Sequence, residues 1–263
     1  MFIVDTHCHV SQTWYEPVES LLYQMDQNDV AQAILIQIGG QYNNSYQVEC
    51  VAKHPDRLAS VVIVDAAHPD ALAHLEQEKE AGAVGVRLSA NTRSAGDDPF
   101  AIWRKAEALG LVVSCSGGRD GFLDDSFASL IEAVPNLPII IEHLGNVNKP
   151  EGGTPPDAIW QKVYGLSRYP NVYIKIHGLG EFCTRARPVQ EPFPFEQPIP
   201  PLLKFAYKAF GPERMMWGSD FPPVSGREGY QCSLQLTLAQ FEDKPQTERD
   251  LIFGGVAQRV FKC

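Results

Sequence analysis

Long hydrophobic runs are missing from this chain of 263 residues. Its apolar stretches, such as residues 137–141, fall far short of the roughly 20 residues that a transmembrane helix needs. The first four residues are apolar, but Asp5, His7 and His9 follow at once and leave no room for the apolar core of a signal peptide. We therefore expect neither a membrane span nor an export signal.

Basic side chains are also scarce, because 22 lysines and arginines stand against 32 aspartates and glutamates, for a net charge of −10. The basic residues form no run. An acidic protein of this kind is a poor candidate for binding nucleic acid or an anionic membrane. The expected partner is a small-molecule substrate, and the sequence leaves a homo-oligomer open.

Paired cysteines and phosphate-binding glycine motifs are absent as well. The six cysteines are scattered without a CxxC pair. Without an export signal, they are predicted to be free thiols in the cytoplasm. The glycine pairs at 39–40, 117–118 and 152–153 suit turns and match neither GxGxxG nor a P-loop. The missing phosphate motif disfavours a doubly wound nucleotide-binding sheet.

The chain does contain a repeating pattern of eight short apolar runs separated by helix-like segments. This pattern indicates parallel strands in βα units. Eight such units predict an α/β fold, a single (β/α)8 TIM barrel over residues 1–263. A doubly wound open sheet is the alternative. We interpret the proline-rich residues 188–201 as a long loop on the catalytic face. The predicted strands are Phe2–Val4, Ala33–Ile38, Ser60–Val64, Ala83–Leu88, Leu111–Ser114, Pro138–Ile141, Val172–Ile176 and Met215–Trp217. The predicted helices lie within 69–75, 99–109, 126–134, 157–167, 200–210 and 247–261.

Alternation along the strands predicts which side chains face the lumen of the barrel. Apolar side chains should pack outward on the helices, and polar ones should point inward near the carboxyl-terminal rim, where barrel active sites lie. Alternation does not place His143, because this residue shares parity with the apolar Ile139 and Ile141. The side chains predicted to face inward are Asp5, His7 and His9, then Arg87 and Ser89, then Ser114 and Ser116, and finally Tyr173, Lys175 and His177.

Two histidines and one aspartate form the strongest candidate site. His7 and His9 project from the same face at the end of the first strand, so two imidazole nitrogens can reach one metal ion. Asp220 follows the last strand, whose rim lies beside that of the first strand when a barrel closes. Its carboxylate could ligate a metal and accept a proton from a metal-bound water. Two surface histidines and a turn aspartate are the plainer interpretation of the same residues.

Three motifs together resemble the amidohydrolase superfamily: DTHCH at 5–9, EHLG at 142–145 and GSDFP at 218–222. The closest branch is the amidohydrolase-related (amidohydrolase-2) family, which the chain resembles over nearly its whole length, including the ending at 254–261. The segments at 85–88 and 175–179 resemble its lactonase-like subgroup of TIM-barrel metal-dependent hydrolases. This resemblance implies a TIM-barrel hydrolase, and related members are metal-dependent decarboxylases.

The sequence departs from that pattern at the fifth strand. Many superfamily members present a histidine or carboxylated lysine near this strand as a metal ligand, whereas Ser116 holds the inward position here. The implied cofactor is one divalent metal, with zinc as the default, manganese as an option and a metal-free site as the alternative. Cys115 could supply a thiolate, but its parity points it outward. Lys175 is predicted to pair with Asp5 inside the barrel.

The predicted function is hydrolysis of a small ester or lactone by water attack on a carbonyl. Asp220 is assigned as general base, and His143 as a donor to the oxyanion or an aid to proton transfer. An anionic, carboxylate-bearing substrate would suit inward Arg87 and the rim arginines Arg119, Arg185 and Arg187, with His177 as a further substrate contact. The alternatives are a non-oxidative decarboxylase or amide hydrolase on the same site, and a non-catalytic ligand-binding barrel.

Overall fold

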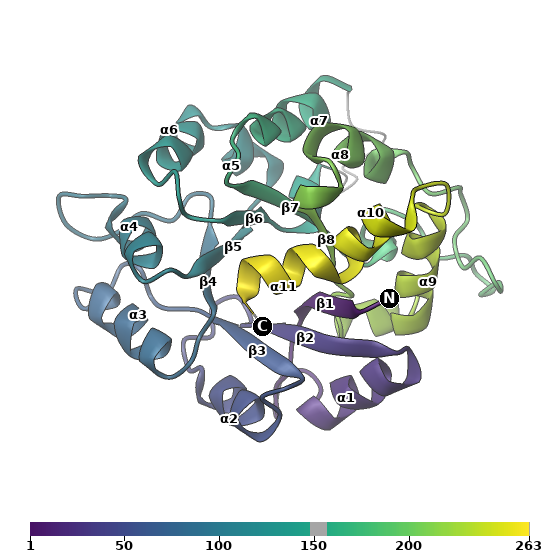
Figure 1. Ribbon diagram of the computed structural model, residues 1–263, viewed down its shortest axis with the longest axis horizontal. Coiled ribbons are helices and arrows are strands. Elements are labelled where there is room, and N and C mark those ends of the chain that lie inside the picture. The colour runs from purple at the N-terminus through teal and green to yellow at the C-terminus, as the bar shows by residue number, and fades with distance from the viewer. Residues whose placement is uncertain (148–156, 263) are drawn as a thin grey trace.

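The computed structural model describes residues 1–147 and 157–262, and within them the chain alternates strands with helices (Figure 1). The strands are β1 (Ile3–Cys8), β2 (Val30–Ile36), β3 (Leu58–Val62), β4 (Gly85–Ser89), β5 (Val112–Ser116), β6 (Ile139–Ile141), β7 (Val172–Ile176) and β8 (Met215–Trp217). The principal helices are α1 (Val18–Gln27), α2 (Ser45–Lys53), α3 (Ala71–Glu80), α4 (Ala101–Ala108), α5 (Arg119–Leu123), α6 (Asp125–Ala133), α7 (Asp157–Tyr164), α8 (Leu202–Phe210), α9 (Tyr230–Ala239), α10 (Gln246–Asp250) and α11 (Val256–Phe261).

Eight parallel strands pair in chain order from β1 to β8, which confirms the predicted (β/α)8 barrel. Backbone contacts beyond the end of β8 close it against β1. The amide of Asp220 donates to the carbonyl of His7, and the amide of His9 donates to the carbonyl of Phe221, both at 2.7 Å. This closure places the ends of the first and last strands side by side at one rim.

Side-chain alternation divides the core into two parts. The outward-facing apolar residues, such as Val113 and Ile174, pack with the helices in one large cluster. The inward-facing apolar residues fill the lumen in a second cluster, which includes Val4, Ile140 and Met216. Helix α11 packs against this second cluster and lies across the strands in Figure 1. The lumen is therefore packed with apolar side chains on the side of α11, and the polar residues gather at the opposite rim.

The predicted elements match the structure at different levels of detail. β7 and β8 have the predicted bounds, whereas β1 runs to Cys8 and not only to Val4. Helices α1, α2, α5 and α9 had no specific prediction. Residues 188–201 do form a long connection between β7 and α8, and they fold back so that Phe195 bridges Arg185.

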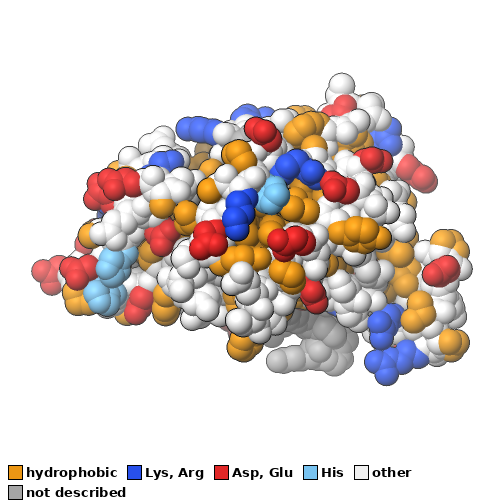
Figure 2. Space-filling model, turned by 90° about the horizontal axis from the view of Figure 1, so that it is seen from below, with side chains coloured by type: hydrophobic (Ala, Val, Ile, Leu, Met, Phe, Trp, Pro, Cys, Tyr) orange, Lys and Arg blue, Asp and Glu red, His pale blue; other side chains and the backbone are white. Residues whose placement is uncertain are grey.

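Within the described residues, no helix is long and apolar enough to cross a membrane. The five described cysteines are free thiols, as predicted. On the face in Figure 2, acidic side chains are spread widely and basic ones form small separate groups.

Candidate active site

Two histidines, one in β1 and one directly after it, form the base of the candidate site. His7 and His9 are buried, with ring centroids 5.0 Å apart. The Nδ1 atom of His9 lies 2.6 Å from the carbonyl oxygen of Ile36. Because a carbonyl only accepts, His9 carries its hydrogen on Nδ1 and presents the lone pair of Nε2 to the site. The same arrangement orients histidines that bind metals.

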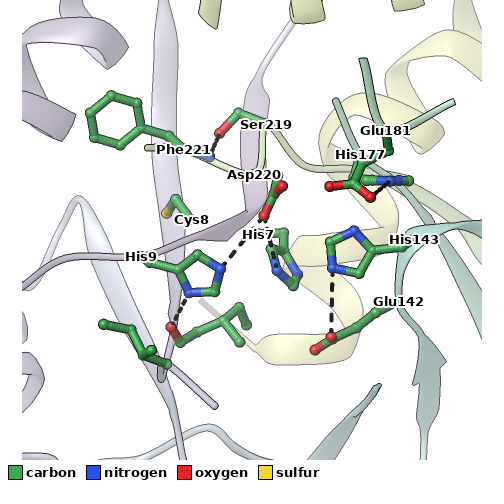
Figure 3. A network of polar contacts seen from close by, with 12 residues as sticks. His7, Cys8, His9, Glu142, His143, His177, Glu181, Ser219, Asp220 and Phe221 are labelled. Carbon is green, nitrogen blue, oxygen red and sulfur yellow. Dashed lines mark hydrogen bonds and ion pairs between the residues drawn. The ribbon is translucent and has the colours of Figure 1, made fainter. Parts of the chain in front are cut away.

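Asp220 reaches these histidines from the turn after β8 (Figure 3). Its backbone adopts a positive φ of 61°. Its Oδ1 atom lies 3.6 Å from Nε2 of His9 and 3.7 Å from Nε2 of His7. The close approach of this turn to β1 requires Gly218, since a Cβ there would lie 2.6 Å from the Cβ of His7.

Arg227 holds the other oxygen of Asp220. Its Nη2 donates to Oδ2 of Asp220 at 2.6 Å, and its Nη1 pairs with Glu181. Burial raises the pKa of Asp220, but His9 and His143, which are protonated in the acid range where this carboxyl titrates, and the Arg227 guanidinium outweigh that effect and hold the pKa well below its usual range. Asp220 is therefore a carboxylate at neutral pH, with Oδ1 facing the two histidines.

His143 is turned into the site by an unusual backbone. Residues 143–146 all have positive φ angles, from 49° at Leu144 to 75° at Gly145. This turn carries the ring inward, although its parity with outward-facing Ile141 would place it outside. The His143 ring lies 4.8 Å from that of His7 and 4.2 Å from that of His177, measured between centroids. Burial lowers the pKa of His143, so a neutral ring is favoured.

Glu142 is a site residue to which sequence reasoning gave no role. It is fully buried and accepts two hydrogen bonds from Arg87, at 3.1 and 2.8 Å, and one from Ser114 at 2.7 Å. Burial raises the pKa of Glu142, but Arg87 and Lys175 outweigh it and bring the pKa to about 2. The alternation of side chains along β6 could have placed Glu142 in the lumen, because it lies two residues after the inward-facing Ile140. Arg87 faces the lumen as predicted, but its guanidinium is committed largely to this ion pair.

Lys175 points inward as predicted, but its expected ion pair with Asp5 is wrong. Its Nζ lies 3.3 Å from Nδ1 of His7 and 3.2 Å from Oγ of Ser114. Asp5 instead accepts hydrogen bonds from the amide and hydroxyl of Ser219, the amide of His7 and the hydroxyl of Tyr230. Asp5 thus anchors the β8 turn to β1, because its two oxygens already have four donors.

Two of the remaining predicted substrate contacts, His177 and Arg185, lie around this centre. His177 is buried, and its Nε2 is 4.0 Å from Oε2 of Glu181. Arg185 donates to the carbonyl of Gly226 at 3.1 Å and lines a cleft of about 380 Å³ with Arg187 and Arg227. Arg119 begins α5, and its side chain lies outside the described part of the chain.

The donor atoms at the rim lie close enough to share one divalent ion. His7, His143 and Asp220 each offer a ligand atom, and these atoms lie within 4.8 Å of one another. Nε2 of His7 is buried without a hydrogen-bond partner among the described residues, and an ion or a substrate would satisfy it. Imidazoles with one carboxylate suit zinc. Ser116 lies at the end of β5 and donates to the carbonyl of Leu88, while Cys115 packs in the outer core, where burial raises its thiol pKa.

A closed parallel barrel with histidines and a carboxylate converging at its rim defines a TIM-barrel protein with an enzyme-like site. The chain belongs to the amidohydrolase family, whose model matches residues 4–263. No match was found among curated proteins.

Several solved structures share the fold. A probable 2-pyrone-4,6-dicarboxylic acid hydrolase from Acinetobacter baumannii, with citric acid bound, is 21% identical over 100% of both chains, with a TM-score of 0.77. An amidohydrolase from Burkholderia multivorans with bound zinc is 19% identical over 100% of this chain and 99% of that one, with a TM-score of 0.78. A 5-carboxyvanillate decarboxylase from Sphingomonas paucimobilis is 16% identical over 99% of both chains, with a TM-score of 0.65.

Proposed function

We propose that this protein hydrolyses a small, carboxylate-bearing ester or lactone, with Asp220 as the general base. The position of Asp220 carries the proposal. Its Oδ1 is buried beside two histidines, while Arg227 occupies Oδ2. Only Oδ1 is therefore turned toward the histidines, which is the arrangement a single proton acceptor needs.

Asp220 can accept a proton because its side chain is a carboxylate at neutral pH. The carboxylate accepts a proton from the attacking water at Oδ1 and returns it to the leaving oxygen. A low pKa makes Asp220 a weak base, so the carbonyl must be electrophilic. The ester carbonyl of a lactone meets that need far better than an unactivated amide.

Neutral histidines can donate to the oxygen that becomes negative during attack. Burial lowers the pKa of His7 well below its usual value and also lowers that of His143. Each neutral ring keeps one N–H, and both rings lie beside Asp220. Such donors, held in place before the reaction, stabilise the oxyanion of a tetrahedral intermediate.

A divalent ion, zinc by preference, would be held by His7, His143 and Asp220, whose ligand atoms lie within 4.8 Å of one another, with Nε2 of His9 3.6 Å from Oδ1 of the same aspartate. Bound there, it supplies a Lewis acid for the carbonyl and lowers the pKa of a coordinated water. The similarity to a zinc-bound amidohydrolase supports this assignment. We extend the proposal to a cytoplasmic protein, because its described cysteines are free thiols.

The arginine-lined cleft suggests where a substrate carboxylate binds. Arg185 and Arg187 line it beside Arg227. Arg227 is already engaged by Asp220 and Glu181, so we assign carboxylate binding to Arg185 and Arg187. The similarity to a pyrone dicarboxylate hydrolase with citric acid bound supports an anionic substrate.

A panel of carboxylate-bearing lactones and esters tests the proposal when the reaction is run in ¹⁸O-labelled water. We expect a hydroxy acid product that carries one labelled oxygen from the water. The second candidate is decarboxylation, favoured by the similarity to 5-carboxyvanillate decarboxylase, and carbon dioxide release would identify it. Ligand binding without either product would point to a non-catalytic barrel.

A further inference from the structure

The fully buried ammonium group of Lys175 lies directly behind His7. Lys175 enters the lumen from β7 and its Nζ reaches two groups, Nδ1 of His7 at 3.3 Å and Oγ of Ser114 at 3.2 Å. Ser114 passes its own hydrogen to the carboxylate of Glu142 at 2.7 Å. The hydroxyl can therefore accept from Lys175 while it donates to Glu142, which gives the buried cation a chain of partners that ends on a carboxylate.

Burial lowers the pKa of Lys175 to about 8, so the amine is mostly protonated at neutral pH. An ammonium group has three donors and no acceptor. At its contact with Lys175, Nδ1 of His7 must then be the accepting nitrogen. A neutral imidazole carries one hydrogen, so that hydrogen sits on Nε2. We propose that Lys175 is a positioning residue that fixes the tautomer of His7, keeping an N–H on Nε2 that points toward Asp220.

The other side of the His7 ring agrees with this tautomer. Nε2 of His7 is 3.7 Å from Oδ1 of Asp220, and a hydrogen on Nε2 faces that carboxylate favourably. His9 is fixed the opposite way, because its Nδ1 donates to the carbonyl of Ile36. The two histidines of one HxH motif thus face the same carboxylate with different chemistry, since His7 offers a hydrogen and His9 offers a lone pair.

Two consequences follow for the site. Where the proposed hydrolysis holds, His7 is the hydrogen-bond donor to the substrate carbonyl. For a metal ion, His7 must first give up the hydrogen on Nε2, and the ammonium behind the ring opposes that change and repels a divalent cation. Lys175 therefore weakens metal binding at a rim whose donor atoms are otherwise within reach of one ion.

The tautomer is read directly by NMR on metal-free protein labelled with ¹⁵N-histidine, with the His7 signals assigned by comparison with His7→Gln. We expect long-range proton–nitrogen correlations to show a protonated Nε2 and an unprotonated Nδ1. A hydrogen on Nδ1 of His7 would overturn the proposal. This measurement needs no substrate, so it stands apart from any failure of the proposed hydrolysis.

Zinc binding by Lys175→Met provides the second readout. Methionine keeps most of the length of lysine and removes the cation, so we expect the zinc dissociation constant to fall at least about tenfold relative to the unaltered protein. Ser114→Ala is the matched control, because it alters the same network and leaves the ammonium in place, and its affinity should stay near that of the unaltered protein. Equal zinc affinity in Lys175→Met and the unaltered protein would show that Lys175 merely fills space. If Lys175→Met does not fold, the NMR result on the unaltered protein decides.

Discussion

Charged side chains inside this barrel are stabilised by defined partners, since a buried charge is costly without them. Glu142 is paired with Arg87, Lys175 contacts Ser114 and His7, and Asp5 accepts from four donors. Each of these groups comes from a different strand or strand end. The polar rim therefore depends on strand order as much as on residue identity.

Glu142 makes the stability of the protein sensitive to acid. Its folded pKa is about 2, below the usual 4.5. The unfolded chain therefore takes up the proton first, and the stabilisation is present above about pH 5 and lost as pH falls toward 2. Between pH 7 and pH 3 this group alone should cost roughly 2 kcal/mol of unfolding free energy.

Urea unfolding of Glu142→Gln at both pH values measures that contribution. We expect a smaller loss of stability between pH 7 and pH 3 than in the unaltered protein, together with a lower stability at pH 7, because Arg87 loses its counter-charge. Glu76→Gln, at a half-exposed surface glutamate, is the control and should follow the unaltered protein. An unchanged pH dependence in Glu142→Gln would contradict the assigned pKa.

Residue patterns in the sequence located most residues of this site but did not predict which of its charged side chains pair with one another. His7, His9, His143, His177 and Asp220 were all named from motifs and strand ends, and they lie together at one rim. The partner of Lys175 was wrong because alternation gives the face of a side chain and not its depth along the lumen. Arg227 had no signal, since it lies in a loop after β8.

The turn from residue 142 to residue 146 is the element that places His143. Its run of positive φ angles contains only one glycine, Gly145, and Asn146 ties it to the carbonyl of Gly117. A Cβ at Gly145 would lie 2.6 Å from Cγ1 of Val163. The positive φ favours glycine at this position, and the close packing against Val163 requires it.

Gly145→Ala should destabilise the protein by roughly 2 kcal/mol and reduce turnover by displacing His143. Thermal unfolding and steady-state kinetics measure the two effects. Gly165→Ala is the matched control, because a Cβ there meets nothing within 4 Å and its φ is not positive. Equal stability of the two variants would show that the turn tolerates a side chain.

Hydrophobic runs in the sequence predicted the positions of those strands that are buried on both faces. β7 and β8 were predicted with their observed bounds. The prediction for β1 stopped at Val4, because Asp5, Thr6 and His7 are polar residues that only the barrel lumen makes compatible with a buried strand. The left-handed turn at His143 was not predictable, since no glycine or proline marks its first two residues.

At the scale of the whole molecule, closure of β8 onto β1 gathers residues from both ends of the chain at one rim. That rim holds two groups of possible ligands, His7 with Asp220 and His177 with Glu181, and both groups depend on the same His143. Ser116 gives the fifth strand no charged ligand to bridge a second ion. A site with few charged ligands should bind zinc less tightly than a two-metal site that has a bridging carboxylated lysine.

We therefore predict at most one zinc per chain, present at less than full occupancy after purification and removable by a chelator. Elemental analysis before and after dialysis against the chelator measures this. The double variant His7→Ala, His9→Ala should hold none, because it removes a ligand from the group around Asp220, and in the other group Glu181 is already paired with Arg227. Two tightly held ions per chain would contradict the single-metal site.

The most direct test is the turnover of Asp220→Asn on the best substrate from the lactone and ester panel. Asparagine keeps the shape of the side chain and removes the proton acceptor, so we predict a fall in kcat of at least about 10²-fold. The fold should be retained, because Arg227 keeps Glu181 as a partner. Asp243→Asn, at an exposed aspartate outside the rim, should retain full activity. Turnover of Asp220→Asn close to that of the unaltered protein would show that another group takes the proton.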